Sequence, residues 1–292
     1  MPEFQKLQDK ISFGGTYPPT TRFDTYPSIN LTNRSNCSSK AVLITGANKG
    51  IGFGIALSYA GGGQVASAIT EEIRKAATDA GRGAVPEVLA LIMDVMDSAT
   101  IKKAAQDVET HFGRLDILVY SAGFLAPYDK ILDGDENEWW QRFSTNLRGG
   151  YLIAKAFLPL MLSKGGDKTT VTISSTGVLH FHQGASSYQI SKFVLLRLME
   201  FIMAEYADQR VLAYSIHPGG VTTDLASKLP QGTQTWLKRS PALNGDTIAF
   251  LTSERQEWPA GRYLTVIWDM DEFFAKKQEI VDRNLLKMRL TF

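Results

Sequence analysis

From Ala41 onward, short apolar runs alternate with longer amphipathic stretches, and this alternation limits the chain to few folds. The runs expected to form strands are AVLIT (41–45), VASAI (65–69), LALIMDV (89–95), LDILVY (115–120), TVTIS (170–174), VLAYSIH (211–217) and YLTVI (263–267). Helical stretches begin at Ile51, Ser98, Glu136, Asn146, Tyr188 and Asn244. Nearly continuous apolar strands separated by helices are typical of a parallel sheet covered on both faces. We therefore predict an α/β fold with a doubly wound, Rossmann-like parallel sheet.

Residues 1–40 do not continue this alternation and contain Gly14-Gly15 and Pro18-Pro19. We expect an irregular N-terminal arm that lies across the body or a partner subunit, because it carries several aromatic side chains. The remainder, 41–292, is expected to be one domain with a lid at 225–243. Its end predicts a C-terminal helix with an apolar stripe through Phe274, Ile280, Leu285 and Met288.

The composition excludes several classes of function. The chain has 31 basic and 30 acidic side chains and no basic block, so nucleic acid is not an expected partner. A single cysteine, Cys37, permits no intramolecular disulfide framework and favours a reducing compartment. No apolar run approaches the length of a membrane span, so we expect a cytoplasmic protein without membrane attachment. His180 and His182 lack clustered ligands, so no metal site is predicted.

A glycine-rich turn follows the first predicted strand and opens the first predicted helix. In the segment TGANKGIG, Gly46 and Gly50 allow a tight turn and close approach to a pyrophosphate, and Gly52 allows close packing of helix and strand. The helix N-terminus adds free N–H groups and a partial positive charge. The residues expected to contact a dinucleotide here are Gly46, Asn48, Lys49, Gly50, Ile51 and Gly52.

The spacing T-G-x-x-x-G-x-G resembles that of the classical short-chain dehydrogenase/reductase family, and further motifs match in order from Ala41 to about Asp269. The resemblance implies cofactor contacts at Asp94, Val95, Ser121, Ala122, Gly123, Pro218, Gly219, Val221 and Thr223, and also at Tyr188 and Lys192. Asn146, within TNLRG, matches the family's structural and catalytic asparagine. The ending RYLTVIWDMDEF, in place of a glycine-rich one, is similar to fungal members.

Tyr188 and Lys192 stand at i and i+4 and therefore share one helical face. Ser175 directly follows the predicted strand TVTIS (170–174), at the edge where open sheets bind ligands. Together the three resemble the family's catalytic triad, and Asn146 would make it a tetrad. The resemblance implies that Lys192 also holds the nicotinamide ribose and that Asn146 anchors a water molecule that relays protons.

Carbonyl reduction requires a proton donor as the hydride arrives, and alcohol oxidation requires the same group as a base. A phenol with a pKa of about 10 is a poor base at neutral pH. An ammonium about 4 Å away contributes roughly 4 kcal/mol, or about three pKa units. We therefore expect Lys192 to bring the pKa of Tyr188 close to neutrality, with Ser175 polarising the substrate carbonyl.

The segment GGGQVASAITEEIRKAATDAG departs from the family pattern because it is short. No Asp ends its strand to accept a ribose 2′-hydroxyl, and no Arg follows to bind a 2′-phosphate. Either the adenosine end is held less completely, or residues are missing from the sequence after Gly63. Lys49 is the one basic side chain placed to meet a 2′-phosphate, which favours NADP over NAD as the cofactor; alternatively, it is a solvated loop charge.

These residues predict an NAD(P)(H)-dependent oxidoreductase that interconverts a ketone and a secondary alcohol, with Tyr188 as general acid/base. We expect the substrate mouth to be built from 124–130, 176–185 and the lid, and Leu229 and Trp236 favour a hydrophobic small molecule. Two alternatives remain open: a non-redox dehydratase or isomerase, and a catalytically idle binding subunit. Helices 146–162 and 188–203 resemble the family's subunit-pairing helices and predict a homodimer or homotetramer.

Overall fold

The computed structural model describes residues 17–30, 37, 39–60, 64–66, 70–79, 86–164 and 166–290. Its centre is a seven-stranded parallel sheet in the order β3-β2-β1-β4-β5-β6-β7. The strands are β1 Ala41–Thr45, β2 Gln64–Ala66, β3 Val88–Leu89, β4 Ile117–Tyr120, β5 Thr169–Ile173, β6 Leu212–His217 and β7 Tyr263–Thr265. The predicted doubly wound parallel sheet is confirmed.

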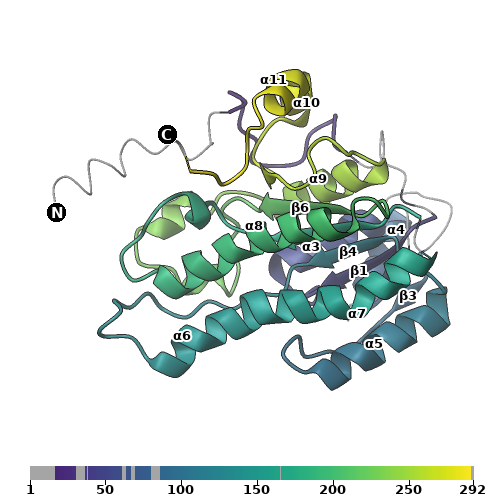
Figure 1. Cartoon of the computed structure of the whole chain (residues 1–292), viewed down its shortest axis with the longest axis horizontal. Coiled ribbons are helices and arrows are strands. Elements are labelled where there is room, and N and C mark those ends of the chain that lie inside the picture. The colour runs from purple at the N-terminus through teal and green to yellow at the C-terminus, as the bar shows by residue number, and fades with distance from the viewer. Residues whose placement is uncertain are drawn as a thin grey trace.

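Helices cover both faces of the sheet. They are α3 Gly50–Ala60, α4 Thr70–Asp79, α5 Ser98–Phe112, α6 Glu136–Phe143, α7 Gly149–Lys164, α8 Ser186–Tyr206, α9 Pro241–Ser253, α10 Met270–Ala275 and α11 Lys277–Asp282. Figure 1 shows α5, α7 and α8 in front of the sheet and α3 and α9 behind it. Among these described helices, none is long and apolar enough to cross a membrane.

Two apolar cores follow from the alternation of side chains along the strands. In β1, Val42 and Ile44 pack with α3 and α9, whereas Leu43 packs on the other face with α5 and α7. Because both faces are buried, the strand reads as a continuous apolar run in the sequence. The sheet is thereby fixed between two layers, and its carboxyl edge is free to carry functional side chains.

Two sequence predictions about elements were wrong. The run 89–95 was expected to form a strand, but β3 pairs with β2 only through Val88 and Leu89, and Ile92 is fully exposed. The C-terminal stripe was expected to form one helix, but it is divided between α10, α11 and an irregular segment from Arg283. Phe274, Leu285 and Met288 nevertheless pack against the core. Their apolar spacing therefore correctly indicated buried side chains, but not one continuous helix.

The described part of the N-terminal segment, 17–30, lies against the C-terminal helices. The Tyr26 hydroxyl accepts a hydrogen bond from Met270 N at 2.7 Å, and Thr20 donates to Glu272. Thr21 forms an antiparallel bridge with Trp268. This segment therefore lies across the body, which is one of the two arrangements expected from its aromatic residues.

Candidate active site

The glycine loop between β1 and α3 has the conformation that its sequence predicts. Gly46 has a φ of 66°, and a Cβ added there would lie 3.0 Å from Ala122 Cα. At Gly52, a Cβ would lie 2.3 Å from Gly46 O. Side chains at either position would therefore break the contact of the loop with its own helix or with the segment after β4.

A cleft of about 410 Å³ opens beside this loop. It is lined by Gly46, Asn48, Lys49, Gly50, Ile51, Gly52, Ser121, Ala122, Gly123, Thr145, Thr222, Thr223, Asp224 and Leu225. The cleft thus joins the glycine loop, the β4 exit and the segment after β6. Most residues predicted to bind a dinucleotide meet here. The predicted residues that are not among the lining residues are Asp94, Val95, Tyr188, Lys192, Pro218, Gly219 and Val221.

Thr45, the last residue of β1, holds two sides of the cleft together. Its Oγ1 accepts hydrogen bonds from Ser121 N and Ala122 N, both at 3.1 Å. These bonds fix the β4 exit against the glycine loop. The cradle of bare backbone that results suits a dinucleotide, whose pyrophosphate requires close approach of the main chain.

Asn146 is fully buried in a π-helical turn, Ser144–Arg148, between α6 and α7. Its Oδ1 accepts from Phe124 N at 2.8 Å, and its Nδ2 donates to Phe124 O at 3.1 Å and to Ser191 Oγ at 3.0 Å. The side chain therefore ties the loop after β4 to α8. Such π-turns occur frequently at functional sites.

Lys192 lies on α8 with its ammonium inside the protein. Its side chain donates from Nζ to Ile173 O at 2.8 Å, and the residue is 4% exposed. A Cβ placed on Gly123 would lie 3.5 Å from Lys192 Nζ and 3.4 Å from Asn146 Oδ1. Lys192 and Asn146 therefore converge below Gly123, at the inner end of the cleft. Burial lowers the pKa of Lys192 to about 8.

Ser175 follows β5 and caps a short 3₁₀ turn, Thr176–Leu179. Its Oγ accepts a hydrogen bond from Gly177 N at 3.0 Å, and its side chain lies close enough to the Tyr188 phenol to lower the pKa of that group. With the Gly177 N–H directed at the Ser175 oxygen, the serine proton is available to the Tyr188 oxygen. The structure therefore brings together the serine and tyrosine that stand thirteen residues apart in the sequence.

The pKa of Tyr188 departs from the sequence-based expectation. Burial raises it above the ordinary value, and the hydrogen bond from Ser175 opposes that shift without reversing it. Lys192 was expected to lower the pKa to near neutrality, but its ammonium is directed at the Ile173 carbonyl. Desolvation of the enclosed phenol dominates its pKa, and Lys192 is not among the groups that shift it.

His217 supports the serine loop from β6. Thr176 N donates to His217 Nδ1 at 2.9 Å, so a neutral imidazole carries its proton on Nε2. Burial, with Arg239 and His180 nearby, lowers the pKa of His217 to about 3. His217 therefore accepts a hydrogen bond from the backbone, and it stays neutral at physiological pH.

The three segments expected to form the substrate mouth lie next to one another. The rings of Tyr128 and His182 are 5.3 Å apart, which joins 124–130 to 176–185. Lys228, in the predicted lid, places its ammonium 5.1 Å from the centre of the Phe124 ring. His180 Nδ1 lies 3.1 Å from Thr176 O, and the backbone N–H of His182 donates to Gln189. No group of three or more potential metal ligands occurs in the described part of the chain.

The adenosine end of the cleft is described only in part. Val95 lines a hollow of about 260 Å³ with Asn48, Leu91 and Met93, whereas Asp94 is exposed and accepts a hydrogen bond from Met96 N. The predicted short strand 65–69 and the question of missing residues after Gly63 fall largely on 61–63 and 67–69, which lie outside the described residues. Lys49 is 67% exposed and pairs with Asp224 at 2.8 Å.

Sequence reasoning missed several residues of the site. They are Thr45, Tyr128, Gln189, Ser191 and Asp224. Thr45 belongs to the T-G motif, which could have identified it as a site residue. Its hydrogen-bond partners, Ser121 and Ala122, follow a different strand, β4. Ser191 stands between Tyr188 and Lys192 and carries no motif of its own, because its function depends on Asn146.

Comparison with known proteins agrees with this geometry. A family model described as short chain dehydrogenase matches residues 40–234. The short chain dehydrogenase citE of Monascus ruber is 43% identical over 287 residues, which cover 96% of this chain and 98% of that protein.

Solved structures have the same fold. A 7α-hydroxysteroid dehydrogenase complexed with NADH and 7-oxo glycochenodeoxycholic acid is similar with a TM-score of 0.69 and 23% identity, covering 83% of this chain and 97% of that one. A short chain dehydrogenase from Shigella flexneri complexed with NADP gives a TM-score of 0.68 and 24% identity, covering 80% and 99%.

Proposed function

Since this chain belongs to the short-chain dehydrogenase family, we propose that it interconverts a ketone and a secondary alcohol with a nicotinamide cofactor. Tyr188 is the general acid/base, Ser175 orients the substrate oxygen, and Lys192 and Asn146 support them. The observation that carries this proposal is the meeting of Asn146 and Lys192 below Gly123, at the inner end of the glycine-loop cleft.

The nicotinamide cofactor would supply or accept the hydride. The backbone around Gly46, Gly50 and Gly52 would hold its pyrophosphate, because added side chains would fill this cradle. Lys192 donates from Nζ to one carbonyl and retains further N–H groups for a ribose hydroxyl. Thr223, whose methyl group lies 3.0 Å from a Cβ built on Gly50, would close the other side of the cleft.

The proton chemistry supports carbonyl reduction. Since the pKa of Tyr188 is raised, its phenol is protonated at neutral pH and is ready to donate. Ser175 receives the Gly177 N–H and has one proton to give, so it polarises the substrate oxygen beside the tyrosine. The hydrogen bond from Thr176 N to His217 Nδ1 holds the loop that carries Ser175.

We favour NADPH over NADH because Lys49 stands at the mouth of the cleft. Its present partner, Asp224, is 78% exposed, and a 2′-phosphate carries more charge than this carboxylate. The substrate is expected to be a hydrophobic ketone, since Phe124 and Tyr128 border the site and Trp236, in the lid, is 64% exposed.

The decisive experiment is a fluorescence titration with NADPH and NADH, followed by a panel of hydrophobic ketones with Tyr188→Phe as the control. We expect NADPH to bind more tightly, one or more ketones to be reduced, and Tyr188→Phe to bind cofactor without turnover. Lys49→Ala is expected to weaken NADPH more than NADH. Turnover without any nicotinamide binding would identify a non-redox enzyme, and binding of neither cofactor nor substrate would identify an idle subunit; either would overturn the proposal.

We also propose a homodimer or homotetramer paired through α7 and α8. Tyr151 on α7 and Ile190 on α8 are 47% and 44% exposed, and exposed apolar side chains favour association. Light scattering is expected to give two or four times the mass of 32.2 kDa. A mass of one chain would contradict the proposal.

A further inference from the structure

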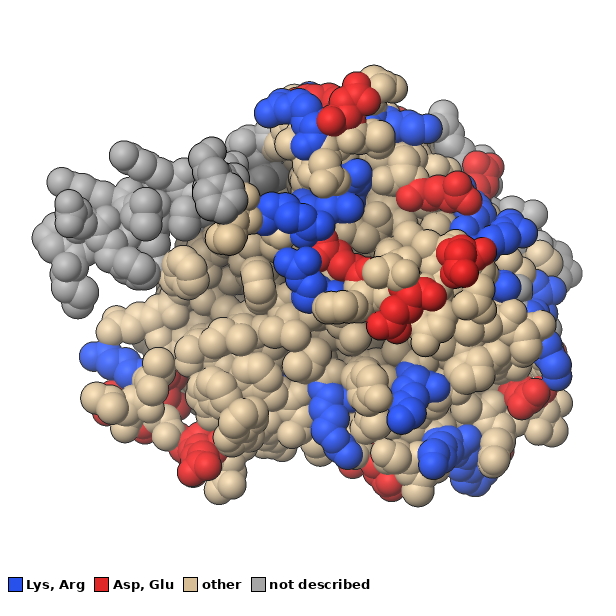
Figure 2. Space-filling view, viewed as in Figure 1, with Lys and Arg blue, Asp and Glu red and all other residues tan. Residues whose placement is uncertain are grey.

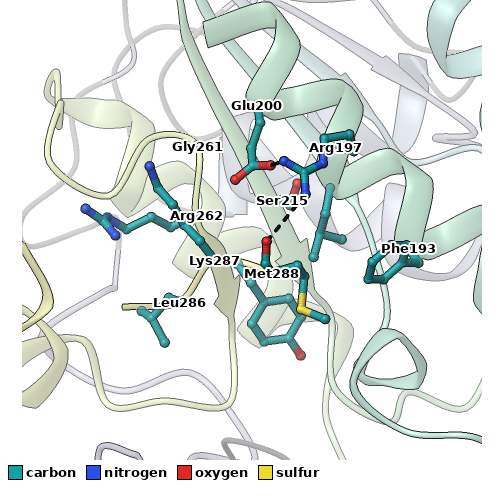
Figure 3. A pocket seen from close by; sticks show the side chains of 11 residues that line it. Phe193, Arg197, Glu200, Ser215, Gly261, Arg262, Leu286, Lys287 and Met288 are labelled. Atoms are coloured by element: carbon teal, nitrogen blue, oxygen red, sulfur yellow. Dashed lines mark hydrogen bonds and ion pairs between the residues drawn. The ribbon is translucent and has the colours of Figure 1, made fainter. Parts of the chain in front are cut away.

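A second cleft lies between the C-terminal half of α8 and the segment 283–290. It has a volume of about 430 Å³ and is lined by Arg197, Glu200, Phe201, Met203, Ala204, Ala260, Gly261, Lys287 and Arg289. A narrower hollow continues inward, shares Arg197, Glu200, Gly261 and Lys287 with it, and reaches Ser215, Arg262 and Tyr263 (Figure 3). None of these residues lines the glycine-loop cleft. The outer volume is within the range of small-molecule sites.

Positive charge exceeds negative charge around this cleft. Four cationic side chains, Arg197, Arg262, Lys287 and Arg289, stand against one carboxylate, Glu200. Figure 2 shows basic side chains gathered in this part of the surface, where the C-terminal segment passes α8. Such an excess attracts anions, and it is greatest where the charges share a concave surface.

The single carboxylate is already engaged. Glu200 pairs with Arg197 at 2.6 Å and with Arg289 at 2.8 Å. Lys287 has no hydrogen-bond or ion-pair partner within the described residues. Burial lowers the pKa of Lys287, and Arg262 and Arg289 lower it further while Glu200 raises it. The folded protein therefore holds Lys287 against like charges, which a bound anion would relieve.

The inner hollow adds an unpaired hydroxyl. Ser215, on β6, is 2% exposed, and its Oγ has no hydrogen-bond partner among the residues that the structure describes. A buried hydroxyl without a partner is costly, so a native protein usually satisfies it with a ligand or water. The hollow holds about 10 Å³, which is close to the space that one water-sized group needs.

Part of the lining of the outer cleft is apolar. Phe201 is 56% exposed, and Met203, Ala204 and Ala260 continue the wall beside it. A bare inorganic anion would leave this wall in contact with water. A ligand with an apolar body and an acidic end would cover the wall and meet the cations at the same time.

We propose that this cleft binds an amphiphilic anion, with its carboxylate or phosphate between Lys287, Arg197 and Arg289 and its apolar body on Phe201. The site is separate from the proposed cofactor cleft, and the proposal does not depend on redox activity.

Calorimetric titration of the full-length protein tests the proposal, with octanoate and octyl phosphate as anionic probes and octanol as the neutral probe. We expect both anions to bind and octanol to bind at least about tenfold more weakly, because it lacks the charge. Lys287→Met is expected to weaken the anions by about tenfold. Lys277→Met, which removes one exposed charge from α11, is the matched control and is expected to bind like the wild type.

Thermal unfolding guards against a trivial loss of structure. Lys287→Met is expected to unfold at the same or a higher temperature than the wild type, since it removes a cation from among cations. Equal affinity for octanol and octanoate, or equal octanoate affinity in Lys287→Met, would overturn the proposal. Failure of both anions to bind would also overturn the proposal. If Lys287→Glu then also differed from the wild type in the mass measured by light scattering, a second copy of the chain would be the occupant of the cleft.

Discussion

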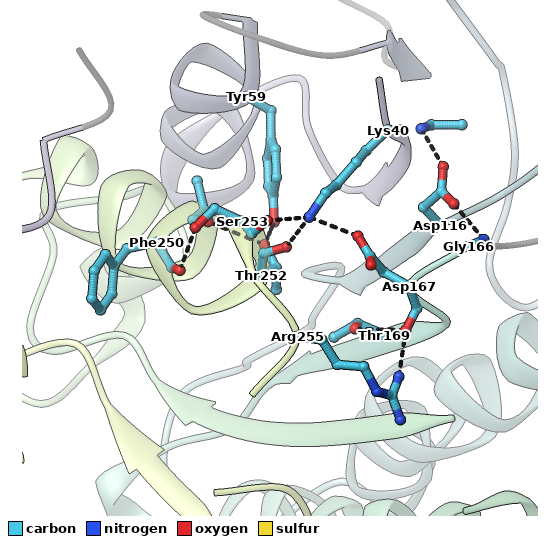
Figure 4. Close-up of polar contacts among 12 residues, drawn as sticks. Lys40, Tyr59, Asp116, Gly166, Asp167, Thr169, Phe250, Thr252, Ser253 and Arg255 are labelled. Atoms are coloured by element: carbon cyan, nitrogen blue, oxygen red, sulfur yellow. Dashed lines mark hydrogen bonds and ion pairs between the residues drawn. The ribbon is translucent and has the colours of Figure 1, made fainter. Parts of the chain in front are cut away.

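Two buried lysines lie at opposite ends of the parallel strands. The amino ends of the strands form the amino edge of the sheet, and the carboxyl ends form its carboxyl edge. The surroundings of the two lysines differ. Lys40, just before β1 at the amino edge, is 9% exposed, and Lys192, below the carboxyl edge, is 4% exposed. Lys40 pairs with Asp167 at 2.6 Å and donates to the carbonyls of Thr252 and Ser253 (Figure 4). Lys192 has one carbonyl and no carboxylate partner in the described structure.

The same contrast extends to the neighbouring groups. At the amino edge, Asp116 accepts from Gly166 N (Figure 4). It also accepts from Ala41 N and pairs with Arg114. At the carboxyl edge, burial lowers the pKa of Lys192 and raises that of Tyr188. One edge satisfies its buried charges, whereas the other holds charges that a ligand would complement. Perturbed groups of this kind cluster at functional sites.

The largest effect is expected from Lys40→Met. Removing the ammonium leaves Asp167 and two buried carbonyls without their partner, which costs about 3–5 kcal/mol of unfolding free energy. Catalytic turnover of the remaining folded protein is expected to be unchanged. Urea unfolding measures the stability and steady-state kinetics measure kcat. A loss of kcat without a loss of stability would contradict the assignment of a structural role to the amino edge and a functional role to the carboxyl edge.

Lys192→Met is expected to act in the opposite sense. Turnover is expected to fall on the order of 10²-fold or more, because the variant loses the cation of the proposed active site. Stability at pH 7 is expected to be equal or higher, since a buried charge without a carboxylate partner is removed. The kinetic and unfolding measurements are the same as for Lys40→Met. A large drop in stability would show that Lys192 is structural.

The pH dependence of stability sharpens the comparison. The pKa of Lys192 is lowered from 10.5 to about 8 in the folded protein, so the unfolded chain binds more protons between these values. The free energy of unfolding therefore gains a contribution that rises with pH from about 8 to 10.5, to a limit of about 3 kcal/mol. Unfolding of the wild type and Lys192→Met across this range measures it. Parallel curves for the two proteins would contradict the assignment.

A smaller effect is expected from His217→Leu. It leaves the Thr176 N–H unpaired beside Ser175, and kcat/KM is expected to fall about tenfold. Because the pKa of His217 is about 3, the wild-type profile between pH 5 and 9 should contain no transition from this residue. His111→Leu, which removes an exposed histidine from α5 outside the proposed site, is the matched control. Equal rates in the two variants would exclude a positioning role for His217.

The sequence predicted the parallel sheet well because both faces of its strands are buried. It failed at 89–95, where Ile92 has the residue type of a strand but is fully exposed and lies outside β3. A hydrophobic pattern in the sequence predicts which side chains are buried and how they alternate. It does not predict how many residues of a strand pair with the neighbouring strand. The prediction of one C-terminal helix was wrong for a similar reason. Buried residues with helical spacing can belong to two short helices and a loop.

Sequence motifs located the candidate residues of the site but not their hydrogen bonds. Asn146 binds Phe124 and Ser191, and Thr176 binds His217, across distant parts of the chain. Such partners depend on how the strands and helices are placed. The raised pKa of Tyr188 could not be predicted from spacing, because desolvation depends on the whole surroundings of the phenol.

The most direct measurement compares two tyrosines, one at each edge. Tyr188 lies beside Ser175 at the carboxyl edge, and Tyr59 bonds Thr252 Oγ1 at 2.6 Å near the amino edge. Measured with the cofactor and ketone that the titration and the panel identify, Tyr188→Phe is expected to lower kcat by about 10²-fold or more with no loss of stability. Tyr59→Phe is expected to keep kcat and lose about 1 kcal/mol of stability. If Tyr188→Phe turned over substrate at the wild-type rate, the assignment of chemistry to the carboxyl edge would be wrong.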